Sequence, residues 1–133
     1  MRALTLTLVA ALTSLLLTTA VTAQEGHPLK GSWIGTWEGN EVHGDFVLIV
    51  LDWNGKAITG VINPGTDDIA ITSATLDPET WAVHIEAAAK DRDGRNLNYV
   101  IDGTIQDLEL PNRYITGTWR NGRGRGDFEI RRQ

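Results

Sequence analysis

The chain has 133 residues, a formal net charge of −5 and no cysteine. This length is typical of one domain, and the missing cysteine excludes a disulfide scaffold, a thiol nucleophile and a cysteine-ligated zinc. The sequence pI of about 5.1 argues against a general nucleic-acid-binding protein, which needs a basic surface, so we expect no nucleic-acid partner.

The first residues predict a secretory signal peptide. A positive charge at Arg2 precedes a long apolar, threonine-rich stretch over residues 3–20, and small residues follow as far as Ala23. We therefore expect residues 1–23 to be removed and residues 24–133 to form one domain, secreted or periplasmic. The alternative is an uncleaved membrane anchor, since a bilayer is spanned by ~20 apolar residues. The small residues at the cleavage position favour removal, with no stable membrane anchor.

Eight apolar stretches rich in β-forming residues follow, each bounded by turn residues. The predicted strands are residues 31–38, 45–53, 56–63, 69–76, 81–90, 97–106, 114–120 and 126–131. The fifth stretch also contains good helix formers. However, Trp81, Val83 and Ile85 alternate with other residues, and this period of two predicts a strand.

Short turns and internal glycines favour a closed barrel. Asn54-Gly55 is a strong hairpin signal, and the other connections are also short, so consecutive strands should be antiparallel neighbours. Gly60, Gly103 and Gly117 lie within predicted strands, where glycine permits the sharp bends of a small barrel. We predict an all-β fold, an eight-stranded antiparallel up-and-down (meander) barrel; an open sandwich is the alternative.

Two short motifs resemble those of calycin-type barrels. The Gly-x-Trp motif at Gly31 and Trp33 is similar to the start of the first strand in lipocalins and avidins. The Gly-Thr-Trp motif at residues 117–119, with the glycine-rich turn after it, resembles the closing hairpin of a small exported bacterial β-barrel module. In such proteins the module stands alone or precedes a hydrolase domain. The resemblance implies a lipocalin-like fold. It does not imply a function, which has to be inferred from the residues of the site.

Aromatic residues are the candidates for a ligand site. Trp33, Trp37 and Trp119 lie on the first and seventh predicted strands, which barrel closure brings near each other. One interpretation is that they fill the core, because small barrels are usually packed with side chains. The other is that they line a cavity for a small apolar ligand together with Tyr99. We expect no cofactor.

The second and third predicted strands depart from simple alternation. Residues 46–51 are apolar at every position, whereas a water-facing barrel has one polar face. One interpretation is that a protein partner, a second copy in a homodimer or residues 25–30 cover the outer side. The alternative is that outer Val and Ile are retained for their β-propensity. The candidate partner-binding residues are Val47, Ile49, Leu51 and Ile58.

The sequence shows no catalytic arrangement. Ser32 and Ser73 are the serines of the expected mature chain, and neither lies in a nucleophile elbow. His84 and Glu86 share one strand face, but a tetrahedral metal site needs more ligands. We therefore predict neither an enzyme nor a metal site.

Charge is distributed unevenly, and it bears on the kind of partner. Basic residues concentrate near the last hairpin, at Arg120, Arg123, Arg125, Arg131 and Arg132, where they would attract an anionic surface or an acidic partner.

We predict an exported, non-enzymatic β-barrel binding module for a small apolar ligand or a protein partner.

The alternative function is an inhibitor of an exported protease. Bacterial inhibitors that the chain resembles are eight-stranded barrels that insert an N-terminal arm, a role that falls here to residues 24–30. This chain lacks the cysteine pair that the resemblance implies.

Overall fold

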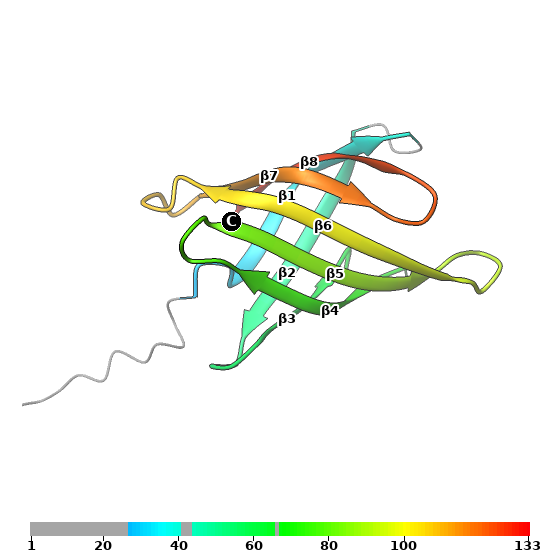
Figure 1. Cartoon of the computed structure of the whole chain (residues 1–133), viewed down its shortest axis with the longest axis horizontal. Helices are drawn as coiled ribbons and strands as arrows, with labels where there is room; N and C mark the ends of the chain where they lie inside the picture. Colours follow the sequence, from blue (N-terminus) through cyan, green and yellow to red (C-terminus); the bar gives the residue numbers. More distant parts are fainter. Residues whose placement is uncertain (1–26, 41–43, 66) are drawn as a thin grey trace, which may run out of the picture.

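The structure is a computed structural model that describes residues 27–40, 44–65 and 67–133. The strands are β1 (Gly31–Gly39), β2 (Asp45–Trp53), β3 (Ile58–Ile62), β4 (Ile69–Leu76), β5 (Ala82–Lys90), β6 (Asn96–Gln106), β7 (Tyr114–Arg120) and β8 (Arg125–Arg132). Each strand pairs antiparallel with the next and β8 pairs with β1, so the sheet closes into an up-and-down barrel (Figure 1). The predicted fold class is confirmed and the open sandwich is excluded. The predicted signal peptide, residues 1–23, lies outside the described residues.

Several strand boundaries differ from the prediction by one or two residues, and two of these differences follow from a local turn. The third strand begins at Ile58 because the side chain of Asn54 accepts hydrogen bonds from the backbone N–H groups of Lys56 and Ala57. The fifth strand begins after Trp81, which has a left-handed φ of 61° and cannot continue a strand.

The two ends of the barrel are built differently. One end carries residues 27–30, the start of β1 and the β2–β3, β4–β5 and β6–β7 connections; we call it the plug end. The other end carries the β1–β2, β3–β4, β5–β6 and β7–β8 connections; we call it the mouth. In Figure 1 the C-terminus lies at the plug end, and the β5–β6 and β7–β8 turns extend at the opposite end.

Residues 27–30 close the plug end. The side chains of Leu29 and Trp33 are both fully buried, and the indole N–H of Trp33 donates a hydrogen bond of 2.8 Å to the carbonyl of Leu29. Arg132 donates from Nε to the carbonyl of Lys30 at 2.8 Å. The segment that the inhibitor hypothesis uses as an arm is therefore, from residue 27 onward, packed against the barrel, with Leu29 in its core.

His27 belongs to the same closure. Its ring centroid lies 4.5 Å from that of Trp53, and its Nδ1 accepts a hydrogen bond of 3.1 Å from the backbone N–H of Leu29. Burial lowers the pKa of His27 below its ordinary value. Only a neutral His27 can accept this hydrogen bond at Nδ1. The lowered pKa, which favours the neutral form, is therefore consistent with the observed hydrogen bond.

The predicted partner-binding residues lie inside the barrel, which corrects that prediction. Val47, Ile49 and Leu51 are each 2% exposed, and Ile58 is 8% exposed. Ile49 pairs in register with the buried Trp33, and the odd-numbered positions of β2 share its inward orientation. When a strand is apolar on both faces, its sequence does not reveal which set of alternate residues points inward.

Glycines allow β8 to approach β1 closely enough to close the sheet. A Cβ atom on Gly126 would lie 1.7 Å from the carbonyl oxygen of Glu38, and one on Gly35 would lie 1.8 Å from that of Glu129. Gly117, predicted as a bend position, is equally restricted, because its Cβ would lie 2.0 Å from the carbonyl oxygen of Asp102. Only glycine fits these three positions without a backbone shift.

Candidate functional site

The interior of the barrel is filled. Its internal cavity measures about 10 Å³, no more than the space that one water molecule needs. The cavity is lined by Trp37, Val47, Ile49, Ile62, Ile101, Trp119 and Phe128. Of the two interpretations of the aromatic residues, core filling therefore describes the interior of the barrel, and the described residues leave no hollow ligand chamber there.

Three aromatic side chains gather above this core, at the mouth. Trp37 stacks on Tyr99 with ring centroids 6.0 Å apart, and the rings of Trp37 and Trp119 lie 5.5 Å apart at a tilt of 46°. Tyr99 and Trp119 complete the triangle at 6.4 Å. The indole N–H of Trp119 donates to the carbonyl of Glu38 at 3.1 Å, which fixes its ring. Strands β1, β6 and β7 each contribute one ring to this cluster, which we call the aromatic triad.

A pocket of about 170 Å³ lies against the aromatic triad and opens at the mouth. It is lined by Trp37, Leu97, Tyr99, Trp119, Asn121, Arg123 and Gly124. We call it the mouth pocket. Leu97 and Tyr99 are two apart on β6 and therefore point to the same side of the sheet. Three of the four residues predicted from the sequence to bind a ligand thus meet in one pocket.

The fourth predicted residue, Trp33, is not part of this pocket. It lies at the plug end, fully buried under Leu29. Trp33 and Trp37 point to the same side of β1, but four residues of extended strand separate them by ~13 Å. Trp33 is therefore a core residue, and its assignment as a ligand-binding residue is corrected.

The β7–β8 turn supplies the polar edge of the mouth pocket. The side-chain oxygen of Asn121 accepts hydrogen bonds from the backbone N–H groups of Arg123 at 2.9 Å and Gly124 at 2.8 Å. This arrangement, in which an Asn side chain imitates a backbone turn, fixes the turn tightly. It presents Arg123 at the edge of the pocket, where about half of the arginine side chain is exposed.

An ion pair ties the β7–β8 turn to the β5–β6 turn. The guanidinium of Arg123 pairs through Nη2 with Oδ2 of Asp91, whose side chain is only 5% exposed. The other oxygen of Asp91 accepts hydrogen bonds from the backbone N–H groups of Asp93 at 2.8 Å and Arg95 at 2.9 Å. Asp91 therefore organises its own turn and also holds Arg123 in place.

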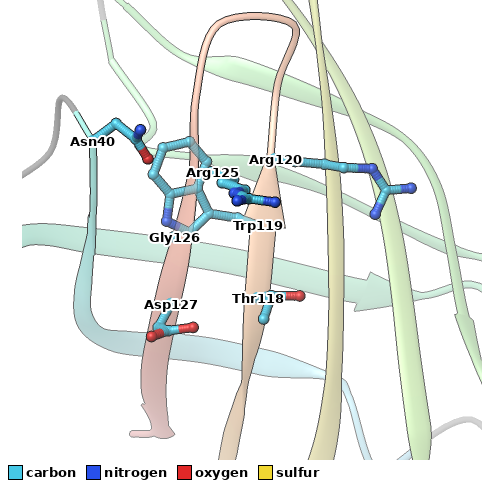
Figure 2. Close-up of a pocket in the computed structure, with 7 residues that line it drawn as sticks. All are labelled: Asn40, Thr118, Trp119, Arg120, Arg125, Gly126 and Asp127. Atoms are coloured by element: carbon cyan, nitrogen blue, oxygen red, sulfur yellow. The ribbon is translucent and has the colours of Figure 1, made fainter.

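A wider hollow lies on the outer side of the last hairpin (Figure 2). It measures about 450 Å³ and is lined by Asn40, Thr118, Trp119, Arg120, Arg125, Gly126 and Asp127. Figure 2 shows Arg120 extending away from Asn40 and Asp127, and its Nη1 lies 3.4 Å from Oδ2 of Asp102. The polar groups of this hollow do not converge on a common point.

The outer face of β5 and β6 carries a small polar network. Nδ1 of His84 lies 2.5 Å from Oδ1 of Asp102, and its Nε2 lies 3.7 Å from Glu86. The hydrogen bond to Asp102 is the main cause that raises the pKa of His84 above its ordinary value. Within the described residues, no group of three or more His, Cys, Asp or Glu side chains is arranged to hold a metal ion.

The sequence prediction identified Arg123 as part of a basic cluster but missed that the β7–β8 turn lines the mouth pocket. A signal was present, because Asn121-Gly122 follows Trp119 after one residue and marks a tight turn close to an inward-facing aromatic residue. The partnership of Arg123 with Asp91 had no such signal, since it joins two different hairpins.

Comparisons with protein-family models, with curated proteins and with solved structures found no significant match. In the part of the chain that the structure describes, no helix has the length and apolar character needed to cross a membrane.

Proposed function

We propose that this protein is a non-enzymatic binding module that holds a small apolar group in the mouth pocket. The observation that carries the proposal is the aromatic triad. Three rings from three strands converge at the rim of a barrel whose core is already full. Trp119 is 3% exposed and belongs to the core, whereas Trp37 and Tyr99 are half-buried and present aromatic surface at the open mouth, which is typical of small-molecule sites.

The size of the mouth pocket restricts the ligand. A cavity of 150 Å³ in another protein holds one benzene molecule, whereas sites for drug-sized molecules measure ~300–1,000 Å³. The mouth pocket, at about 170 Å³, is close to the first value. The proposed ligand is therefore a molecule with one ring, or a single ring at the end of a longer molecule.

We also propose that the module is exported and related to calycin-type barrels. The signal-peptide pattern of residues 1–23 supports export, and Gly31 and Trp33 at the start of β1 support the relationship. The closed eight-stranded antiparallel barrel is consistent with the relationship to calycin-type barrels.

Nuclear magnetic resonance of the indole N–H groups tests the binding proposal. The five tryptophans give five side-chain signals, and those of Trp37 and Trp119 should shift when toluene or phenol is added. The signals of Trp33 and Trp53, at the plug end, serve as internal references and should stay in place. Trp37→Leu should weaken binding at least tenfold, whereas the matched variant Trp53→Leu should leave it unchanged. If single-ring probes at millimolar concentration move no signal of the aromatic triad, the proposal fails.

A protein partner on the outer face of β1 to β3 is a second candidate function. The outward residues of β2 include Phe46, which is 63% exposed, and the half-buried Leu48 and Val50. Ile34 pairs with Leu48, and Val61 pairs with Val50, so these apolar side chains are contiguous. Light scattering at high concentration tests whether a second copy covers this face; a strictly monomeric protein argues against a homodimer.

A further inference from the structure

We propose that the ligand of the mouth pocket is a single-ring carboxylic acid, with its ring against the aromatic triad and its carboxylate on Arg123. This inference rests on the proposed function and specifies its chemistry. It follows from the polar groups at the rim, from the charge of the two flanking turns and from the volume of the pocket.

The rim of the mouth pocket offers hydrogen-bond donors. The side-chain oxygen of Asn121 is already used by two backbone N–H groups, so its amide NH₂ is the part left to face a ligand. Among the described residues of the lining, Arg123 is the charged one, and a guanidinium has donors only. A ligand group that accepts several hydrogen bonds, such as a carboxylate, matches this edge.

Asp91 does not occupy all of the Arg123 donors that a ligand carboxylate would use. One of its oxygens accepts two backbone N–H groups, and the other pairs with Nη2 of Arg123. The guanidinium has five N–H donors in a planar fork, and the described residues show a partner for Nη2 alone. The remaining donors can bind a carboxylate, whose two oxygens match the fork.

The charge of the two turns beside the mouth pocket favours an anion. Residues 90–96 and 120–125 together carry six basic and two acidic side chains, although the whole chain has a formal charge of −5. The basic residues are Lys90, Arg92, Arg95, Arg120, Arg123 and Arg125. A local excess of positive charge raises the concentration of anions beside these two turns and speeds their association there.

The volume of the mouth pocket indicates which part of the ligand lies inside it and which part stays at the rim. About 170 Å³ accommodates one ring against the triad, while the carboxylate remains at the rim beside Arg123, whose side chain is 48% exposed. The charged group thus keeps part of its hydration, and only the apolar ring is removed from water.

A matched pair of probes tests the inference. Benzoate and benzamide share one ring, but only benzoate is charged at neutral pH. Titrations monitored on the indole signals of Trp37 and Trp119 should give benzoate a dissociation constant about tenfold below that of benzamide. Arg123→Gln should abolish this preference. Arg125→Gln, which removes a positive charge from the same hairpin outside the mouth pocket, should keep most of it.

A second variant separates the charge of Arg123 from its structural role. Asp91→Asn removes the negative charge beside Arg123 and keeps the positive charge of Arg123 itself, so benzoate should bind at least as tightly as in the unaltered protein. An unchanged Trp33 indole signal verifies that each variant is folded. If Asp91→Asn loses the preference as fully as Arg123→Gln does, the ion pair and not a direct contact is responsible, and the inference is overturned.

The two proposals fail in different ways. Equal binding of benzoate and benzamide overturns the carboxylate inference and leaves the ring-binding function standing. Absence of any shift with both probes overturns both.

Discussion

Replacing Leu29 by alanine tests whether residues 27–30 are a structural plug. Leu29 is fully buried, and leucine-to-alanine changes at such positions lower the free energy of unfolding by ~2–5 kcal/mol. A domain of this size is stable by ~5–15 kcal/mol, so the loss is a large fraction of the total. With an m value of ~2 kcal/mol per molar urea, a loss of ~3 kcal/mol lowers the unfolding midpoint by ~1.5 M.

The plug segment should unfold together with the barrel, so that the full loss is measured. Three successive backbone carbonyls, those of Pro28, Leu29 and Lys30, accept hydrogen bonds from barrel side chains. Release of the segment alone would leave the buried indole N–H of Trp33 without its acceptor, which costs ~1–3 kcal/mol. The segment and the barrel are therefore expected to form one cooperative unit.

The assay is urea unfolding followed by circular dichroism, with Leu110→Ala as the matched control. Leu110 is 49% exposed on the β6–β7 connection, so its truncation should change stability by no more than ~0.5 kcal/mol. A midpoint for Leu29→Ala equal to that of Leu110→Ala would refute the assignment of residues 27–30 as a plug. It would instead favour a segment free to act as an inhibitory arm.

Two further predictions concern barrel closure and the polar network. Gly126→Ala should lower the free energy of unfolding by ~1–3 kcal/mol or more, because the new Cβ would lie 1.7 Å from the carbonyl oxygen of Glu38. In the same thermal-unfolding series Gly122→Ala, whose Cβ meets nothing within 4 Å, should match the unaltered protein; equal losses would contradict the reasoning. Asp102→Asn should return the raised pKa of His84 toward 6.5 in a proton NMR titration, and an unchanged pKa would contradict the assigned cause. Since folding raises this pKa, the stabilisation by His84 is complete below pH 6.5 and is lost as the pH rises through the folded-state value.

Alternation and turn residues were sufficient to predict the fold. They determine which residues share a face, and short turns leave consecutive strands no other arrangement than a meander. They do not determine which face is inside when both are apolar, and Val47, Ile49 and Leu51 were assigned to the wrong side for that reason.

The candidate site was predictable only in part, for a related reason. Trp37 and Trp119 could be identified as neighbours, because closure joins the first strands to the last. The separation of Trp33 from Trp37 follows from their spacing on one extended strand and was open to prediction. The pairing of Arg123 with Asp91, by contrast, depends on how two hairpins lie against each other in space. No local pattern in the chain records that arrangement.

Pairing of β1 with β8 also has a consequence for the order of folding. The two strands that seal the barrel are the first and last of the described chain, and their closest approach, at Gly35 and Gly126, forms only when both are present. A chain that emerges progressively, whether from a ribosome or through a membrane pore, has unpaired sheet edges until its last strand appears. During that interval the apolar residues of β2 and β3 are accessible to other chains. Pairing of β8 is thus expected to protect this protein from aggregation, and a chain that lacks β8 is expected to lose solubility as well as the intact mouth.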